Sequence, residues 1–195
     1  MSILSHRTLL GLAVAATLVP ALAAEAPQFG LQAAIMQPLA TVNNFSNRTG
    51  FAVAATLELS LDAHQSLRPR FEYTKSPAQT TTLTTSPGDI ISTDSVSSSG
   101  QHYYLGADYL IKPFTGSQGV YLFVGLGVCK TSLKQDWNYS SSSSEEVGTD
   151  QTRVGYCAGL GFAFSRQLSL ESKVTVSDFN GLTVSWATLG ASFKF

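Results

Sequence analysis

Alternation of apolar and polar residues over eight separate segments constrains this 195-residue chain more than any other feature. Successive side chains of a β-strand point to opposite faces, so a period of two predicts strands and excludes amphipathic helices. In one segment, for example, Val120, Leu122, Val124 and Leu126 share a face. The eight predicted strands are Phe29–Gln37, Gly50–Leu61, Leu67–Lys75, His102–Ile111, Val120–Lys134, Thr152–Phe164, Leu168–Ser177 and Thr183–Phe195.

The connections between these segments alternate between short and long. The short ones are Asp62–Ser66, Lys112–Gly119 and Ser165–Gln167, and the long, polar ones are Gln37–Thr49, Ser76–Gln101 and Gln135–Gln151. The last connection breaks this rhythm, because Asn180-Gly181 is typical of a tight hairpin turn. Segments of about ten residues span a membrane when tilted, and membrane barrels have short turns on the periplasmic side. The pattern predicts an all-β fold, an eight-stranded antiparallel transmembrane up-and-down β-barrel with both mature termini in the periplasm.

A soluble barrel of the lipocalin type is the alternative. Its inner face would be apolar, whereas here charged residues stand behind the apolar face. The end of the chain also favours a membrane. Thr188 to Phe195 alternates to the last residue, with Gly190 facing one way and Phe193 and Phe195 the other. Aromatic side chains at the end of a lipid-facing strand are typical of the bilayer interface, where membrane barrels have girdles of aromatic residues. The segment resembles the assembly signal at the C-terminus of bacterial outer-membrane barrels.

The start of the chain agrees with export. Residues 1–7 form a short basic segment, and the following run from Thr8 to Val19 is mostly apolar. Ala21-Leu22-Ala23 then matches the small-x-small pattern of a signal-peptide cleavage site. We expect a signal peptide over residues 1–23 and a barrel domain over residues 24–195. Removal of Arg7 leaves eleven of the twelve basic residues against thirteen acidic ones. A net charge of about −2 argues against nucleic acid as a partner.

The inward faces carry four acidic and four basic residues, which we expect to neutralise each other across the lumen. A symmetric turn over Asp62–Ser66 would pair Glu58 with Arg70. A balanced set favours a polar plug over a selective pore, which would show one dominant sign. The predicted lumen network consists of Glu58, Arg68, Arg70, Glu72, Asp108, Arg153, Glu171 and Lys173.

The only two cysteines, Cys129 and Cys157, have inward parity on neighbouring strands. If the intervening loop is centred near Ser143, they lie opposite each other. In an oxidising compartment this arrangement predicts one cross-strand disulfide, with two buried free thiols as the alternative. The same register sets Gly125 against Gly161 and Gly127 against Gly159, which leaves room either for large side chains or for a small apolar ligand.

Sequence motifs for catalysis are absent: there is no zinc spacing, nucleotide loop or nucleophile elbow, so we expect no catalytic residue, metal or cofactor. His102 is the only histidine near a potential site, and Asp94 with the loop serines could complete a His-Ser-acid arrangement. No local motif supports it. The Ser- and Thr-rich residues 76–100 and 135–151 are expected to be solvated loops that could contact a surface ligand.

In its terminal Thr188–Phe195 signal, its eight alternating segments and its loop rhythm, the chain resembles the small outer-membrane β-barrels that include OmpX- and OmpW-like proteins. The resemblance implies insertion by the outer-membrane assembly machinery from a chaperone-bound periplasmic state, and contact with outer-membrane lipids and lipopolysaccharide. Three functions are compatible with it. The leading one is a non-enzymatic envelope or surface-contact protein with a filled lumen, followed by an OmpW-like channel for hydrophobic solutes and a lipid-modifying enzyme.

Overall fold

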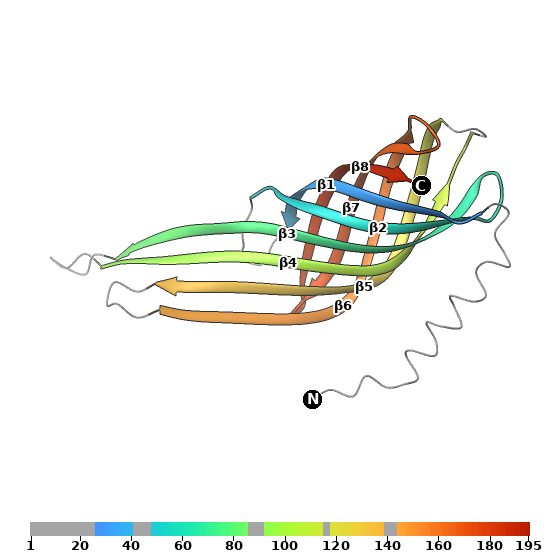
Figure 1. Cartoon of the computed structure of the whole chain (residues 1–195). Helices are drawn as coiled ribbons and strands as arrows, with labels where there is room; N and C mark the ends of the chain where they lie inside the picture. Colours follow the sequence, from blue (N-terminus) through green and yellow to red (C-terminus); the bar gives the residue numbers. More distant parts are fainter. Residues whose placement is uncertain (1–25, 41–47, 86–91, 115–117, 139–143) are drawn as a thin grey trace.

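The computed structural model describes residues 26–40, 48–85, 92–114, 118–138 and 144–195. Its strands are β1 (Gln28–Ala40), β2 (Gly50–Ser60), β3 (Gln65–Thr85), β4 (Ser92–Ile111), β5 (Gly119–Asn138), β6 (Ser144–Ala163), β7 (Leu168–Phe179) and β8 (Leu182–Lys194). Each strand pairs antiparallel with the next, and β8 pairs with β1 to close the barrel (Figure 1). The predicted eight-stranded up-and-down barrel is confirmed. The expected signal peptide, residues 1–23, lies outside the described residues.

The barrel is apolar outside and polar inside. On β5, the outward Leu122, Val124 and Leu126 are 51–58% exposed, whereas the inward Tyr121 and Phe123 are 3% and 2% exposed. A soluble globule would reverse this arrangement, because exposed apolar surface of this extent costs free energy in water. In the described part of the chain, no helix is long and apolar enough to cross a membrane.

Strands β3 and β4 are about twice as long as predicted, β5 and β6 are also longer, and all four extend past the barrel as a four-stranded sheet (Figure 1). We call residues 76–85, 92–100, 133–138 and 144–149 the protruding sheet. The end of the barrel that bears it is the distal end, and the end where β1 begins and β8 finishes is the proximal end. The expectation of solvated loops over residues 76–100 and 135–151 is therefore wrong for most of their length. Threonines such as Thr80, Thr81 and Thr82 favour extended backbone, and each added strand supplies hydrogen-bond partners to its neighbours.

The β7–β8 hairpin has the predicted turn and register. Asn180 and Gly181 have φ angles of 54° and 76°, and a turn with two positive φ angles matches the twist of the strands that it joins. Leu168 lies opposite Phe193 and Thr175 lies opposite Trp186, as expected. A two-residue turn leaves no freedom in register, which is why this pairing could be deduced from the sequence.

The β5–β6 hairpin has a different register from the predicted one. Asn138 pairs with Ser144, so the loop is centred near residue 141, and Gly125 lies opposite Cys157. Two glycines of β6 face aromatic rings of β5: a Cβ at Gly159 would collide with Phe123, and one at Gly161 would collide with Tyr121. These two glycines fit the inward rings of β5 and so help to set the observed register.

Candidate functional site: the barrel lumen and the protruding sheet

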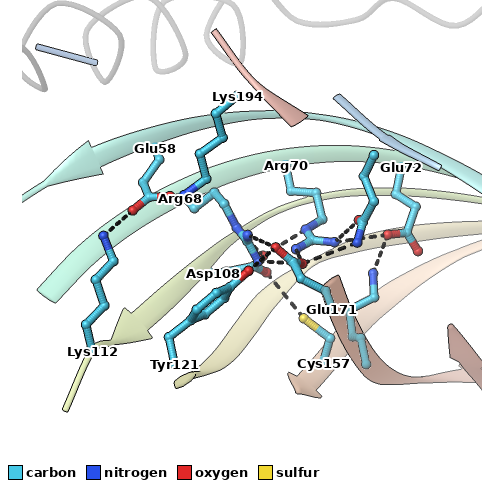
Figure 2. Close-up of polar contacts among 12 residues, drawn as sticks. Glu58, Arg68, Arg70, Glu72, Asp108, Lys112, Tyr121, Cys157, Glu171 and Lys194 are labelled. Atoms are coloured by element: carbon cyan, nitrogen blue, oxygen red, sulfur yellow. Dashed lines mark hydrogen bonds and ion pairs between the residues drawn. The ribbon is translucent and has the colours of Figure 1, made fainter. Parts of the chain in front are cut away.

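Two arginines and two carboxylates from three strands meet in the middle of the lumen (Figure 2). Arg68 on β3 contacts Asp108 on β4 at 3.0 Å and Glu171 on β7 at 2.5 Å. Arg70 contacts the same two carboxylates at 2.8 Å and 3.0 Å. All four side chains are at most 1% exposed. Because β3 and β7 are not neighbours in the barrel, the two ion pairs with Glu171 cross the lumen from wall to wall, whereas those with Asp108 join neighbouring strands.

Further polar groups satisfy this central network. Gln32 on β1 accepts a hydrogen bond from Arg70 at 2.8 Å and donates one to Glu171 at 3.3 Å. The hydroxyl of Tyr121 donates to Glu171 at 2.7 Å. The side chains of Glu72 and Lys173 form a second buried ion pair beside Arg70. Buried charges are tolerated when they are paired and hydrogen-bonded, as they are here.

Aromatic rings pack against the guanidinium groups. The Phe123 ring centroid lies 4.9 Å from the Arg68 guanidinium carbon and 5.5 Å from that of Arg70, a distance at which the ring attracts a cation. The sequence prediction of the network included neither Phe123 nor Tyr121 nor Gln32. In the sequence, Phe123 and Tyr121 on β5 and Gln32 on β1 alternate with the outward apolar residues. This alternation already indicates that their side chains face the lumen.

Glu58 is buried near the proximal end and binds two lysines. Its carboxylate contacts Lys112 at 2.5 Å, and its second oxygen contacts Lys194, the penultimate residue (Figure 2). The predicted pairing of Glu58 with Arg70 is wrong. In the observed β2–β3 register Thr56 lies opposite Arg70, two positions from the symmetric expectation. A shift of two keeps every side chain on its face, so alternation alone could not reveal it.

The distal half of the lumen contains a buried cluster of apolar and aromatic side chains. Trp186 is 1% exposed and stacks on the His102 ring with centroids 4.4 Å apart. Tyr104, also 1% exposed, lies deeper, and its ring centroid is 5.7 Å from the Lys173 ammonium nitrogen. The buried apolar cluster here comprises Met36, Ala52, Tyr104, Cys129, Cys157, Phe179, Val184 and Trp186, together with Leu133 at the base of the protruding sheet.

Seven of the eight residues predicted for the lumen network are buried inside the barrel, and Arg153 is the exception. Its side chain is 53% exposed, and its Nε lies 3.7 Å from Asp178 at the distal rim. Arg153 has inward parity, but β6 has already left the barrel at this height, since its pairing with β7 ends at Gly155 and Ser177. The alternation of side chains therefore shows which face of a strand a residue occupies, but beyond the last β6–β7 pair that face no longer borders the lumen.

Both cysteines are buried and free, so the predicted disulfide is wrong. Cys129 pairs with Arg153, whereas Cys157 pairs with Gly125. The two cysteines are thus four positions apart along the hairpin, which is about 13 Å at 3.3 Å per residue. A disulfide needs Cα atoms within about 7 Å. Tyr104 lies opposite Cys129, and its hydroxyl is 3.8 Å from the Cys157 sulfur, so its ring runs between the two thiols.

The residues of the expected assembly signal lie on the closing strand. Thr188 and Gly190 face inward, and Gly190 packs against Ala34 of β1, where a Cβ would collide. Phe193 and Phe195 face outward with ring centroids 5.1 Å apart. The Phe195 amide donates to the Phe29 carbonyl at 2.8 Å, which continues the pairing of β8 with β1 to the final residue. The segment thus forms the seam of the barrel.

The protruding sheet has two edges to which no described strand is paired. The pairing of β2 with β3 ends at Lys75, and that of β7 with β6 ends at Gly155. The β6 edge carries Glu145 and Glu146, whereas residues 76–85 of β3 contain no charged side chain. Next to the β6 edge, Lys134 on β5 contacts Glu146 at 3.0 Å, which raises the pKa of Lys134. Charges on an edge discourage further pairing, so the two edges differ in their protection.

The arrangement around His102 does not match the catalytic hypothesis. Its Nδ1 lies 3.1 Å from the Thr131 hydroxyl, and its ring stacks on Trp186. Asp94 lies eight positions further along β4, about 26 Å away at 3.3 Å per residue. A catalytic acid must be within hydrogen-bond reach of its histidine. Among the described residues, no group of three or more His, Cys, Asp or Glu side chains could hold a metal ion.

Comparisons with known proteins agree with this architecture. Residues 8–195 match the family model of the outer membrane protein beta-barrel domain. The chain is similar to the crystal structure of Ail, the attachment invasion locus protein of Yersinia pestis, with a TM-score of 0.60 and 13% identity over 87% of this chain and 97% of that chain. It is also similar to OprG from Pseudomonas aeruginosa, with a TM-score of 0.52 and 13% identity over 89% and 98% of the two chains. No curated protein sequence matches. At these identities the structural likeness concerns the fold.

Proposed function

The chain belongs to the outer membrane protein β-barrel family, and from this premise we propose that it is a non-enzymatic scaffold of the outer membrane. Its lumen is filled by side chains and holds the barrel rigid. Its protruding sheet contacts other molecules at the cell surface. The observation that carries the proposal is the central ion-pair network, which joins β3, β4 and β7 across the lumen.

Three successive levels of the lumen support a plug. A cavity of about 430 Å³ opens at the proximal end, and Tyr121 forms part of its wall. The hydroxyl of Tyr121 is bound to Glu171, so this cavity ends at the central network. Beyond the network, Tyr104 and Trp186 occupy the distal half, each 1% exposed. An eight-stranded barrel is just wide enough for side chains to fill it.

Conductance in planar lipid bilayers tests the plug. Purified protein, first checked for the heat-modifiable gel migration of a folded barrel, should give no discrete current steps above those of protein-free bilayers. Reproducible steps from the folded fraction would contradict a filled lumen. They would favour the channel for hydrophobic solutes, whose expected basis was free space at Gly125, Gly127, Gly159 and Gly161. Against that channel, the space over Gly159 and Gly161 is occupied by the rings of Phe123 and Tyr121.

The protruding sheet supports the surface-contact role. An unpaired strand edge presents backbone N–H and C=O groups to which an extended segment of another protein can add as a further strand. Residues 76–85 of β3 form the edge without charged side chains, and we propose it as the contact. Ail has been crystallised with a heparin analogue, sucrose octasulfate. In this chain Lys130 and Lys134 are each paired with a carboxylate, so these two lysines favour a protein segment over a sulfated glycan.

A shortened hairpin tests this role. Replacing residues 77–99 by an Asn-Gly turn removes the β3–β4 part of the protruding sheet and leaves the barrel register intact. The variant should keep its heat-modifiable migration, while bacteria expressing it should attach less than wild type to protein-coated surfaces. Equal attachment by both strains would contradict the contact at this edge. A Glu145→Gln variant, altered only on the β6 edge, is the matched control and should attach like wild type.

The orientation and surroundings of the barrel are part of the same proposal. The proximal end faces the periplasm, the protruding sheet faces outward, and the apolar band contacts outer-membrane lipids and lipopolysaccharide. The chain reaches the membrane from periplasmic chaperones through the outer-membrane assembly machinery. A single cysteine introduced at Ser97 in a background without Cys129 and Cys157 should react with a membrane-impermeant maleimide in intact cells. One introduced at Ala63, in the β2–β3 turn, should not react.

A further inference from the structure

Both cysteines have free thiols, and in the folded barrel they lie too far apart to form a disulfide. They are the only cysteines of the chain and stand 28 positions apart. Both are buried, at 1% and 4% exposure, on the lumen side of adjacent strands. A loop of this length closes readily in an unfolded chain. The unfolded chain can therefore form a bond that the folded chain cannot contain.

Such a bond would select a defined wrong pairing of β5 with β6. Placing Cys129 opposite Cys157 moves the hairpin four positions from the observed register, in which Gly125 lies opposite Cys157. An even shift keeps apolar side chains on the outer face, so alternation does not oppose it. The rings of Tyr121 and Phe123 would, however, leave the space over Gly161 and Gly159.

The rest of the barrel cannot absorb this shift. β5 is paired with β4 from Ile111–Leu122 onward, and β6 is paired with β7 from Ala163–Ser169 onward. A four-residue displacement between β5 and β6 changes the total stagger around the barrel. Strand number, stagger and tilt are linked in a closed barrel, so β8 would no longer meet β1 in its register.

We propose that the chain is assembled with both thiols reduced and that their oxidation before β5–β6 pairing blocks closure of the barrel. In the blocking step the two thiols lose two electrons and two protons and form one S–S bond. A disulfide-type oxidant takes up these electrons and protons, and its own S–S bond becomes two thiols. Once the barrel is closed, burial and the Tyr104 ring between the sulfurs protect both thiols from this reaction.

Refolding of the full-length mature chain from urea into detergent micelles tests the proposal. One sample is reduced with dithiothreitol, and a second is oxidised in urea with oxidised glutathione, after which the monomer with an intramolecular disulfide is isolated and verified by mass. The oxidised chain should give at least tenfold less of the heat-modifiable folded form, and dithiothreitol should restore it. Equal folding of both samples would overturn the proposal.

Two further measurements separate the disulfide from other effects of oxidation. The Cys129→Ser/Cys157→Ser double variant, taken through the same treatment, should fold equally with and without oxidant; a loss as large as that of wild type would overturn the proposal. The second measurement needs no variant. Already folded wild-type barrel exposed to oxidant should retain two thiols that can be alkylated after unfolding. Formation of the intramolecular disulfide in the folded barrel would contradict the register argument.

Discussion

Replacement of Glu171 by glutamine should destabilise the barrel far more than any exposed charge change. The Glu171 carboxylate, 1% exposed, binds Arg68 at 2.5 Å and Arg70 at 3.0 Å and accepts from Tyr121 at 2.7 Å. Glutamine has nearly the same shape but no charge, and it presents an amide NH₂ to one of these donors. Removing one partner of a buried ion pair costs about 3–5 kcal/mol, because the remaining charge is left uncompensated. Asp108 still binds both arginines, so we expect a value near the lower end, about 3 kcal/mol.

Urea unfolding in detergent micelles, followed by the fluorescence of the lumenal Trp186, measures this loss. A loss of about 3 kcal/mol lowers the folding equilibrium constant roughly a hundredfold. Glu146→Gln is the matched control, since it also removes a carboxylate from an ion pair. The side chains of Glu146 and Lys134 are 62% and 56% exposed, so this change should leave the unfolding midpoint unaltered. If E171Q unfolds at the same urea concentration as wild type, the central network does not stabilise the barrel and the reasoning is refuted.

Two other predictions concern packing and charge. Gly161→Leu should reduce the yield of refolded barrel by forcing the buried Tyr121 ring out of its place, with a cost of about 1–3 kcal/mol, whereas Gly148→Ala, which has open space around it, should refold like wild type. A wild-type yield for Gly161→Leu would contradict the role assigned to this contact. In the β5–β6 hairpin, beyond the closed part of the barrel, the hydrogen bond from Ser132 and the nearby Lys130 lower the pKa of Asp150 below its ordinary 3.8. These two interactions therefore stabilise the β5–β6 hairpin above pH 3.8, and their stabilisation is lost as the pH falls through the lowered pKa of Asp150. The carboxyl carbon of Asp150, followed by NMR, should titrate below pH 3.8 in wild type and at higher pH in Ser132→Ala; an unchanged midpoint in the variant would contradict this assignment.

The two errors of register share one physical cause. The β2–β3 pairing differs from the prediction by two positions and the β5–β6 pairing by four. Side chains alternate with a period of two, so every even shift produces the same distribution of apolar and polar faces. Only the two-residue Asn180-Gly181 turn removed this freedom, and there the predicted register is confirmed.

The length of β3 to β6 was underestimated for a different reason. The prediction of a strand rested on contrast between an apolar and a polar face, and this contrast is lost where Ser and Thr occupy both faces, even though Val96 and Ser98 are buried on one of them. Residues 95–99, Ser-Val-Ser-Ser-Ser, illustrate the point, because their composition is equally typical of a solvated loop. They are extended because β3 and β5 pair with them on either side.

The sequence by itself determined the number of strands, their antiparallel order, the apolar outer face and the set of charges available to the lumen. Each of these follows from local spacing, because a strand exposes every second side chain to the same solvent. The tertiary structure decided which charges meet, where the two thiols lie and how far the sheet continues beyond the barrel. Glu58 binds Lys112 and Lys194 rather than Arg70, since closure of the barrel sets the heights of non-neighbouring strands. The position of one strand along the barrel axis relative to a distant strand depends on the stagger of every strand pair between them. No single segment of the chain determines this total stagger.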